Sequence, residues 1–160
     1  MYSKFLKYHF IFNLLLFISF SVAVNSFAEI EFINILLYIF FHLIFIYYLF
    51  YHYSLFLYLI GFFYGLMFDI ILLNSIGAHL ISFLLLISIY IFLKKYLFLL
   101  TPNQITFTIF ITLYAILFFE IIFTFFYNNI NFSFSHLLKY LIIGAIIFIP
   151  SIQILNRINN

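Results

Sequence analysis

The chain has 160 residues, of which 69% are hydrophobic and only 6% are charged. Soluble domains carry about 25% charged residues, so this composition could not cover the surface of a water-soluble fold. The net charge of +2 is too small to indicate a nucleic-acid partner, and a chain without cysteine has no disulfide framework or thiolate metal site. These quantities predict a single integral membrane domain over residues 1–160.

Six apolar stretches predict six transmembrane helices. Each crossing needs about 20 mainly apolar residues, so six crossings use about 120 residues and leave only short loops. Backbone groups in lipid must be hydrogen-bonded within the protein, which favours helices. The predicted helices are Phe10–Phe27, Ile33–Tyr51, Ser54–Leu73, Ala78–Leu93, Thr106–Phe126 and Leu137–Ile154. The predicted fold class is therefore an all-α polytopic bundle.

Short polar segments separate the predicted helices, and two of them leave alternatives open. The break at His52-Tyr53 is barely polar, so a five-span protein with a long bent element there is the alternative to six spans. The first apolar stretch could also be a signal peptide, because Ser26-Phe27-Ala28 resembles a small-residue cleavage site. The remaining breaks are Ala28–Glu31, Asn74–Gly77, Lys94–Gln104 and Asn128–Ser135.

The basic residues predict the orientation of the chain, because lysine and arginine favour cytoplasmic loops. With the N-terminus inside, only Lys139 falls at an outer helix end. The other basic residues then lie on the cytoplasmic side: Lys4, Lys7, Lys94, Lys95 and Arg157. We therefore expect a multi-pass protein with both termini in the cytoplasm.

The third predicted helix carries a face of small residues that ends in an acidic one. Gly61, Gly65 and Asp69 are spaced four apart, so they drift by only about 80° and share one side of a helix. Glycines at this spacing let a second helix backbone come close, since lipid provides no hydrophobic drive for association. Two interpretations are open: the face packs within the chain, or it binds a partner helix.

The stretch around this face resembles the MreD family, rod shape-determining membrane proteins of bacteria. The family pattern is a glycine pair four apart, an Asp four later, a polar turn, and a glycine followed by His or Arg. Matching residues are Gly61, Gly65, Asp69, Gly77 and His79. The close resemblance covers about residues 58–93. The chain departs from the family at Ile33-Asn34, where it keeps the amide but lacks the usual proline.

The resemblance implies a non-enzymatic scaffold in the bacterial inner membrane that supports lateral peptidoglycan synthesis and cell shape. Its implied partners are an MreC-like protein and, through it, MreB and a RodA-type polymerase with its transpeptidase. The Gly61–Gly65–Asp69 face is the first candidate for binding a partner span. No zinc-protease, serine-hydrolase or P-loop motif appears, so we expect no enzyme activity and no cofactor. The alternative is a membrane-embedded substrate-binding subunit of a vitamin-type importer.

Several polar residues lie near the predicted outer ends of their helices. At about 1.5 Å per residue they fall within roughly 10 Å of one membrane surface. They are Asn34, Asp69, His79, Glu120 and Lys139. A charge at the bilayer centre costs at least about 2.5 kcal/mol, and such groups usually pair. We therefore expect Lys139 to neutralise Asp69 or Glu120; the alternative is that each group reaches the headgroups separately.

Overall fold

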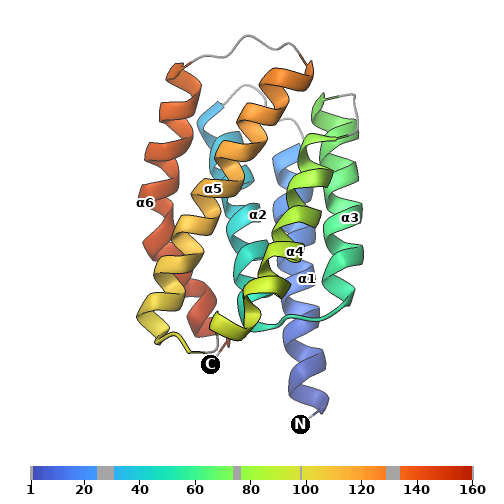
Figure 1. Ribbon diagram of the computed structural model, residues 1–160, viewed down its shortest axis with the longest axis vertical. Coiled ribbons are helices and arrows are strands. Elements are labelled where there is room, and N and C mark those ends of the chain that lie inside the picture. Colours follow the sequence, from blue (N-terminus) through green and yellow to red (C-terminus); the bar gives the residue numbers. More distant parts are fainter. Residues whose placement is uncertain (1, 25–30, 74–76, 98, 129–133, 160) are drawn as a thin grey trace. The chain divides into compact units, whose positions relative to one another are not determined.

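The computed structural model describes residues 2–24, 31–73, 77–97, 99–128 and 134–159 of the chain. These residues form six α-helices and one π-helical turn, η1, that directly continues α3 (Figure 1). The elements are α1 (Tyr2–Val24), α2 (Glu31–Tyr51), α3 (Phe56–Phe68), η1 (Asp69–Leu73), α4 (Ala78–Leu97), α5 (Pro102–Asn128) and α6 (Phe134–Asn159). The prediction of an all-α polytopic membrane protein is confirmed.

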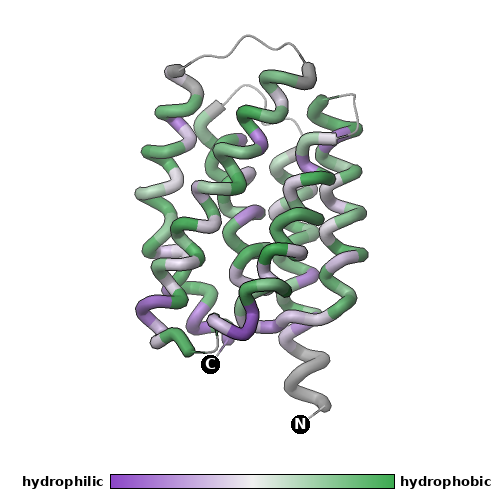
Figure 2. Tube along the Cα trace, in the orientation of Figure 1, coloured by the Kyte–Doolittle hydropathy of each residue, from purple (hydrophilic) through white to green (hydrophobic). Residues whose placement is uncertain are grey.

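Five of these helices are long and apolar enough to cross a membrane, judged by length and composition. They are α2, α3 with η1, α4, α5 and α6. The apolar stretch of α1, Tyr8–Ala23, is shorter than these. Hydrophobic residues dominate all six helices, and many of the hydrophilic positions lie near helix ends (Figure 2).

Most of the helices extend beyond the predicted apolar stretches, because capping groups rather than hydropathy determine where a helix ends. The predicted break from Lys94 to Gln104 is an example, since α4 continues to Leu97 and α5 already begins at Pro102. Proline suits the first helical position, where its missing N–H costs nothing. Gln104 Oε1 accepts a hydrogen bond from the N–H of Thr101 at 2.8 Å, which is half of a capping box.

The break between α2 and α3 excludes a continuous bent helix across His52 and Tyr53, which the sequence had left open. The N–H of His52 makes a last helical bond to Tyr48 at 2.8 Å, and Tyr53 and Ser54 then leave the helical conformation. The long bent element of the five-span alternative is therefore wrong. The predicted cleavage motif at 26–28 and the turn residues 74–76 lie outside the described residues.

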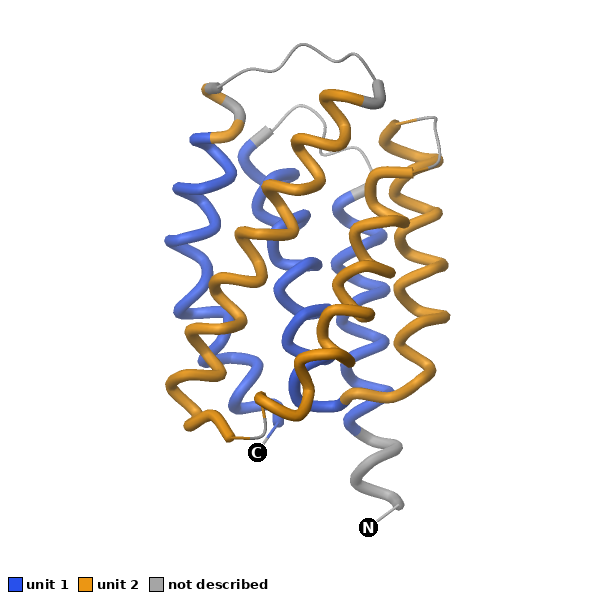
Figure 3. Tube along the Cα trace, in the orientation of Figure 1, with its two compact units in different colours: residues 1–52, 138–160 blue, residues 53–137 orange. Residues whose placement is uncertain are grey.

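The chain divides into two compact units, which Figure 3 shows in two colours. Unit 1 comprises residues 1–52 and 138–160, and therefore α1, α2 and most of α6. Unit 2 comprises residues 53–137, and therefore α3, η1, α4 and α5.

Aromatic side chains of α1 and α2 form the core of unit 1. All the residues from Phe41 to Leu49 on α2 are buried. The ring of Phe12 stacks on both Tyr47 and Tyr48, with centroid distances of 5.7 and 5.2 Å. His42 is fully buried, and its Nδ1 lies 2.8 Å from the backbone oxygen of Tyr38, so this mid-helix imidazole is hydrogen-bonded to a neighbour.

Two hydrogen bonds join the C-terminal ends of α2 and α6. The hydroxyl of Tyr47 donates to Asn156 Oδ1 at 2.7 Å, and His52 Nε2 lies 2.6 Å from Asn159 Oδ1. Burial lowers the pKa of His52 below its ordinary value of 6.5, while the hydrogen bond to Asn159 acts in the opposite direction. The folded chain therefore favours neutral His52.

The stability of this junction should depend on pH. A histidine whose pKa is lower in the folded state binds its proton more readily when the chain unfolds, so stability falls as the pH drops below about 6.5. We expect the thermal midpoint of the detergent-solubilised protein to decrease between about pH 7 and about pH 5. The decrease should be smaller in His52→Gln, and an equal decrease in both proteins would contradict the assignment.

Candidate functional site

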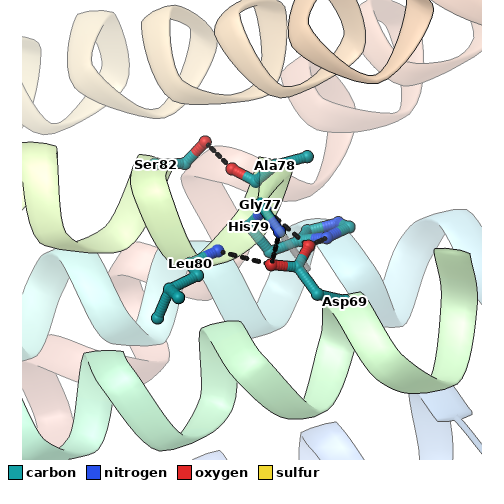
Figure 4. A network of polar contacts seen from close by, with 6 residues as sticks. All are labelled: Asp69, Gly77, Ala78, His79, Leu80 and Ser82. Atoms are coloured by element: carbon teal, nitrogen blue, oxygen red, sulfur yellow. Dashed lines mark hydrogen bonds and ion pairs between the residues drawn. The ribbon is translucent and has the colours of Figure 1, made fainter. Parts of the chain in front are cut away.

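The carboxylate of Asp69 lies at the N-terminus of α4, where Figure 4 shows its contacts. Its Oδ2 accepts hydrogen bonds from the backbone N–H of Gly77 at 2.7 Å and of Leu80 at 3.1 Å. Its Oδ1 accepts one from the backbone N–H of His79 at 2.9 Å. One side chain of η1 thus accepts hydrogen bonds from three backbone N–H groups, one directly before α4 and two in its first turn.

This arrangement follows from what a helix start lacks. The first N–H groups of a helix have no partner within the helix, and the N-terminal end carries a partial positive charge. A short polar side chain within the same turn usually accepts these bonds. In α4 the cap comes from Asp69 on the preceding element, and its side chain is fully buried.

His79 provides the fourth donor through its side chain. Its Nδ1 lies 2.9 Å from Oδ1 of Asp69, and both side chains are buried. The imidazole is therefore oriented with Nδ1–H towards the carboxylate. Glu120 on α5, itself only 3% exposed, lies within electrostatic range of this imidazole. Two carboxyl groups of unit 2 thus act on the same imidazole.

Gly65 allows the two helices of this hairpin to come close. A Cβ placed on Gly65 would lie 2.7 Å from Cα of Leu80 and 3.1 Å from the backbone oxygen of His79. Real Cβ atoms essentially never lie as close to another atom as this Cβ would to Cα of Leu80, and backbone cannot move aside as a flexible side chain can. The hydrogen at Gly65 is thus required for the approach of α3 and α4.

The face of Gly61, Gly65 and Asp69 is therefore a packing face of the chain itself. All three residues are buried, and the space next to Gly65 and Asp69 is filled by the start of α4. At Gly65 and Asp69 the chain's own helix occupies this face, so a partner helix has no room there. At Gly61 the binding of a partner helix stays a prediction.

Gly77 lies in the turn directly before α4. Its φ is 156°, a value that residues with a Cβ rarely adopt, and its N–H is one of the donors to Asp69. We call the set Gly65, Asp69, Gly77, His79 and Leu80 the Asp69 clamp. The clamp explains the spacing of the sequence pattern, because the residue of close approach, the capping carboxylate, the turn glycine and the imidazole donor follow in that order along one hairpin.

The predicted outer polar layer is divided between the two units. Asp69, His79 and Glu120 belong to unit 2, whereas Asn34 and Lys139 belong to unit 1. Lys139 is exposed, and its pairing with Asp69 or Glu120 stays a prediction. All four groups that donate hydrogen bonds to Asp69 belong to the hairpin of α3 and α4.

The sequence predicted His79 as a residue of the turn and of the outer polar layer, but its pairing with Asp69 was not predicted. Residues that flank a short turn between two antiparallel helices lie at the same level, and this could have indicated the pair. Nothing in the sequence indicated the contact of Leu80 with Gly65, because this contact involves backbone atoms alone.

The chemistry of the clamp is that of a structural bond. The carboxylate of Asp69 accepts four hydrogen bonds in a buried position, so its oxygens are occupied and shielded from external molecules. Among the described residues, no group of three His, Asp or Glu side chains could hold a metal ion. The arrangement is suited to holding two helices at a fixed distance.

Fold and site together define a polytopic helical membrane protein whose central hairpin is closed by a buried carboxylate. Comparison of the chain with protein-family models, with curated proteins and with solved structures finds no match.

Substitution of Gly65 tests the close approach of the hairpin. In Gly65→Ala the new methyl group must push Leu80 away, so we expect a loss of about 1–3 kcal/mol in the free energy of unfolding. Denaturant titration in mixed micelles, followed by circular dichroism, measures this change. Met67→Ala is the control on the same helix, because the side chain of Met67 is 43% exposed. A loss in Gly65→Ala no greater than in the control would contradict the geometry.

A double-mutant cycle tests the pairing of Asp69 with His79. Asp69→Asn removes the charge and replaces one acceptor by a donor, so we expect a loss of about 1.5–3 kcal/mol. Once Asp69 is changed, His79→Gln should cost less than in the wild type, with a coupling energy of about 0.5–3 kcal/mol. Additive effects of the two changes would show that they do not interact.

Proposed function

We propose that this chain is a non-enzymatic scaffold of the bacterial cell-elongation machinery, similar in role to MreD. The observation that carries the proposal is the pattern Gly61, Gly65, Asp69, Gly77 and His79, which is the stretch that resembles that family. Four of its five residues, Gly65, Asp69, Gly77 and His79, belong to the Asp69 clamp, so the resemblance concerns a largely coupled set and not isolated positions.

The proposed partners are those of the family: an MreC-like protein, and through it MreB and a RodA-type polymerase with its transpeptidase. Because Gly65 and Asp69 are occupied within the hairpin, a partner span would have to dock elsewhere. The outward side of α3 is one place, since Leu59, Phe63 and Met67 are exposed at a spacing of four residues. The clamp would fix the hairpin that carries this stripe.

Co-purification from native membranes tests the proposal. A tagged chain should recover an MreC-like single-span protein together with polymerase components. Recovery of a transport ATPase with its transmembrane coupling subunit would instead support the importer alternative and contradict the scaffold. Depletion of the chain should convert rod-shaped cells to rounded ones, and unchanged cell shape after complete depletion would also contradict it.

The proposed location is the bacterial inner membrane, with six spans and both termini in the cytoplasm. Although the apolar part of α1 is short, the whole helix of 23 residues is about 35 Å long, enough to cross a bilayer. An even number of spans places the termini on one side.

Reporter fusions test the orientation. A fluorescent protein that folds only in the cytoplasm should be active after Lys95 and at the C-terminus. Alkaline phosphatase, which is active only outside, should report after residue 130. The opposite result at the Lys94-Lys95 segment would overturn the orientation, because these two lysines are its strongest determinant.

A further inference from the structure

One side of α6 is exposed along most of the helix and becomes polar near its C-terminal end. Its apolar part consists of Ile142, Ile146 and Ile149, which are 58%, 69% and 64% exposed. Gln153 and Arg157 continue the same side and are exposed as well. At about 100° per residue, all five positions lie within about 80° of one another around the helix axis. We call these five residues the α6 stripe.

The two polar side chains of the α6 stripe have no partner within the part of the chain that the structure describes. Neither the amide of Gln153 nor the guanidinium of Arg157 forms a hydrogen bond or an ion pair there. An amide that faces lipid without a hydrogen bond costs free energy. Gln153 can donate two hydrogen bonds and Arg157 five, so this end of the stripe is suited to an acceptor supplied from outside the chain.

The charge of Arg157 is not compensated within unit 1. Among its described residues, the only acidic one is Glu31, at which α2 begins. Arg157 follows Asn156, which accepts the hydrogen bond of Tyr47. From Glu31 to Tyr47 the helix rises about 24 Å, three times the screening length of about 8 Å at physiological salt. An anion from outside unit 1 therefore meets a cation without a competing carboxylate.

The order of residues along the α6 stripe matches the order of groups in a phospholipid. Arg157 lies in the last turn of α6, at the end of the membrane-spanning stretch Leu137–Asn159. Ile149 and Ile146 lie about 12 and 17 Å from it along the helix axis, on the side of the bilayer interior. The acyl chains of a lipid whose phosphate lies at Arg157 run in the same direction, past Gln153 and along these isoleucines.

Two other occupants fit the α6 stripe less well. Copies of one membrane protein share one orientation, so a second copy paired along this stripe would bring two Arg157 side chains together, and like charges repel. Free phosphate would satisfy Arg157 but would leave the isoleucines without a partner molecule. A zwitterionic lipid carries its own cation, which competes with Arg157 for the phosphate. An anionic lipid has none of these disadvantages.

We propose that the α6 stripe binds one anionic phospholipid. The guanidinium of Arg157 donates to the headgroup phosphate, for which its planar fork of N–H groups is well shaped. Gln153, one turn deeper, donates to an ester carbonyl of the glycerol part. The three isoleucines contact an acyl chain. The site belongs to unit 1, whereas the Asp69 clamp belongs to unit 2, and it does not depend on the proposed scaffold function.

Native mass spectrometry of the full chain in detergent, with equal amounts of phosphatidylglycerol and phosphatidylcholine, tests the site. The wild type should retain phosphatidylglycerol preferentially. A basic residue near an anionic headgroup contributes about fivefold in binding, so Arg157→Gln should lower retention of phosphatidylglycerol about fivefold and remove the preference. Lys95→Gln is the matched control, because it removes the same charge from an exposed position in the last turn of α4 and should keep the preference.

A second variant tests the depth of the site without changing any charge. Gln153→Leu removes the amide and keeps a side chain of similar size. It should lower the retention of both lipids severalfold and leave the preference for phosphatidylglycerol in place, because both lipids have ester carbonyls. Inorganic phosphate added in excess should not displace phosphatidylglycerol from the wild type, since it makes no contact with the isoleucines.

Four results would overturn the proposal. They are equal retention of the two lipids by the wild type, a preference that survives Arg157→Gln, an equal loss in Lys95→Gln, and displacement of the lipid by inorganic phosphate. The same spectra report the oligomeric state, and a dimer that Gln153→Leu dissociates would assign the stripe to a second copy instead. Circular dichroism of each variant shows whether a loss of lipid reflects a loss of helical structure.

Discussion

A helix that begins close to the apolar layer of a membrane has backbone N–H groups that neither lipid nor the helix itself can satisfy. In this chain the carboxylate of Asp69 accepts three of these groups at the start of α4. The position of α4 relative to α3 depends on this interaction, because the carboxylate belongs to one element and the donors to the next. Gly65 and Gly77 are needed for the same interaction. Gly65 lets the backbones of α3 and α4 come close, and Gly77 adopts the backbone conformation of the turn before α4.

A buried carboxylate is costly in lipid, and its cost explains why the clamp includes His79. Three backbone hydrogen bonds and one to the imidazole of His79 replace the water that Asp69 would have outside the membrane. Glu120 acts on the same imidazole from α5, so the polar groups of unit 2 are concentrated at one end of its hairpin. The other end keeps only Lys94 and Lys95, and unit 2 therefore has an acidic end and a basic end.

The number and order of the helices could be predicted from the sequence, because apolar length is the dominant signal in a chain that lipid surrounds. Helix ends could not, since α5 begins where Pro102 and Gln104 provide a start and not where the residues become apolar. For the candidate site, the spacing of Gly61, Gly65 and Asp69 predicted a common face, and this face exists. The spacing alone could not show whether this face packs against a helix of the same chain or against a partner protein. The structure answers this question through the backbone of Leu80, which lies against Gly65. The pattern of side chains in the sequence does not specify where that backbone lies.

The internal use of this face changes what a scaffold role would require. If Gly65 bound a partner span, the hairpin would be open until the partner arrived, and the buried carboxylate would lie exposed to lipid. With the clamp closed by the chain's own residues, α3 and α4 form one unit before any encounter. A partner then meets a preorganised surface and does not have to order the helices, which lowers the entropic cost of association. A pattern of small residues and one aspartate can thus contribute to binding without contacting the partner. It would do so by fixing the position of α3, whose outer side would form the contact.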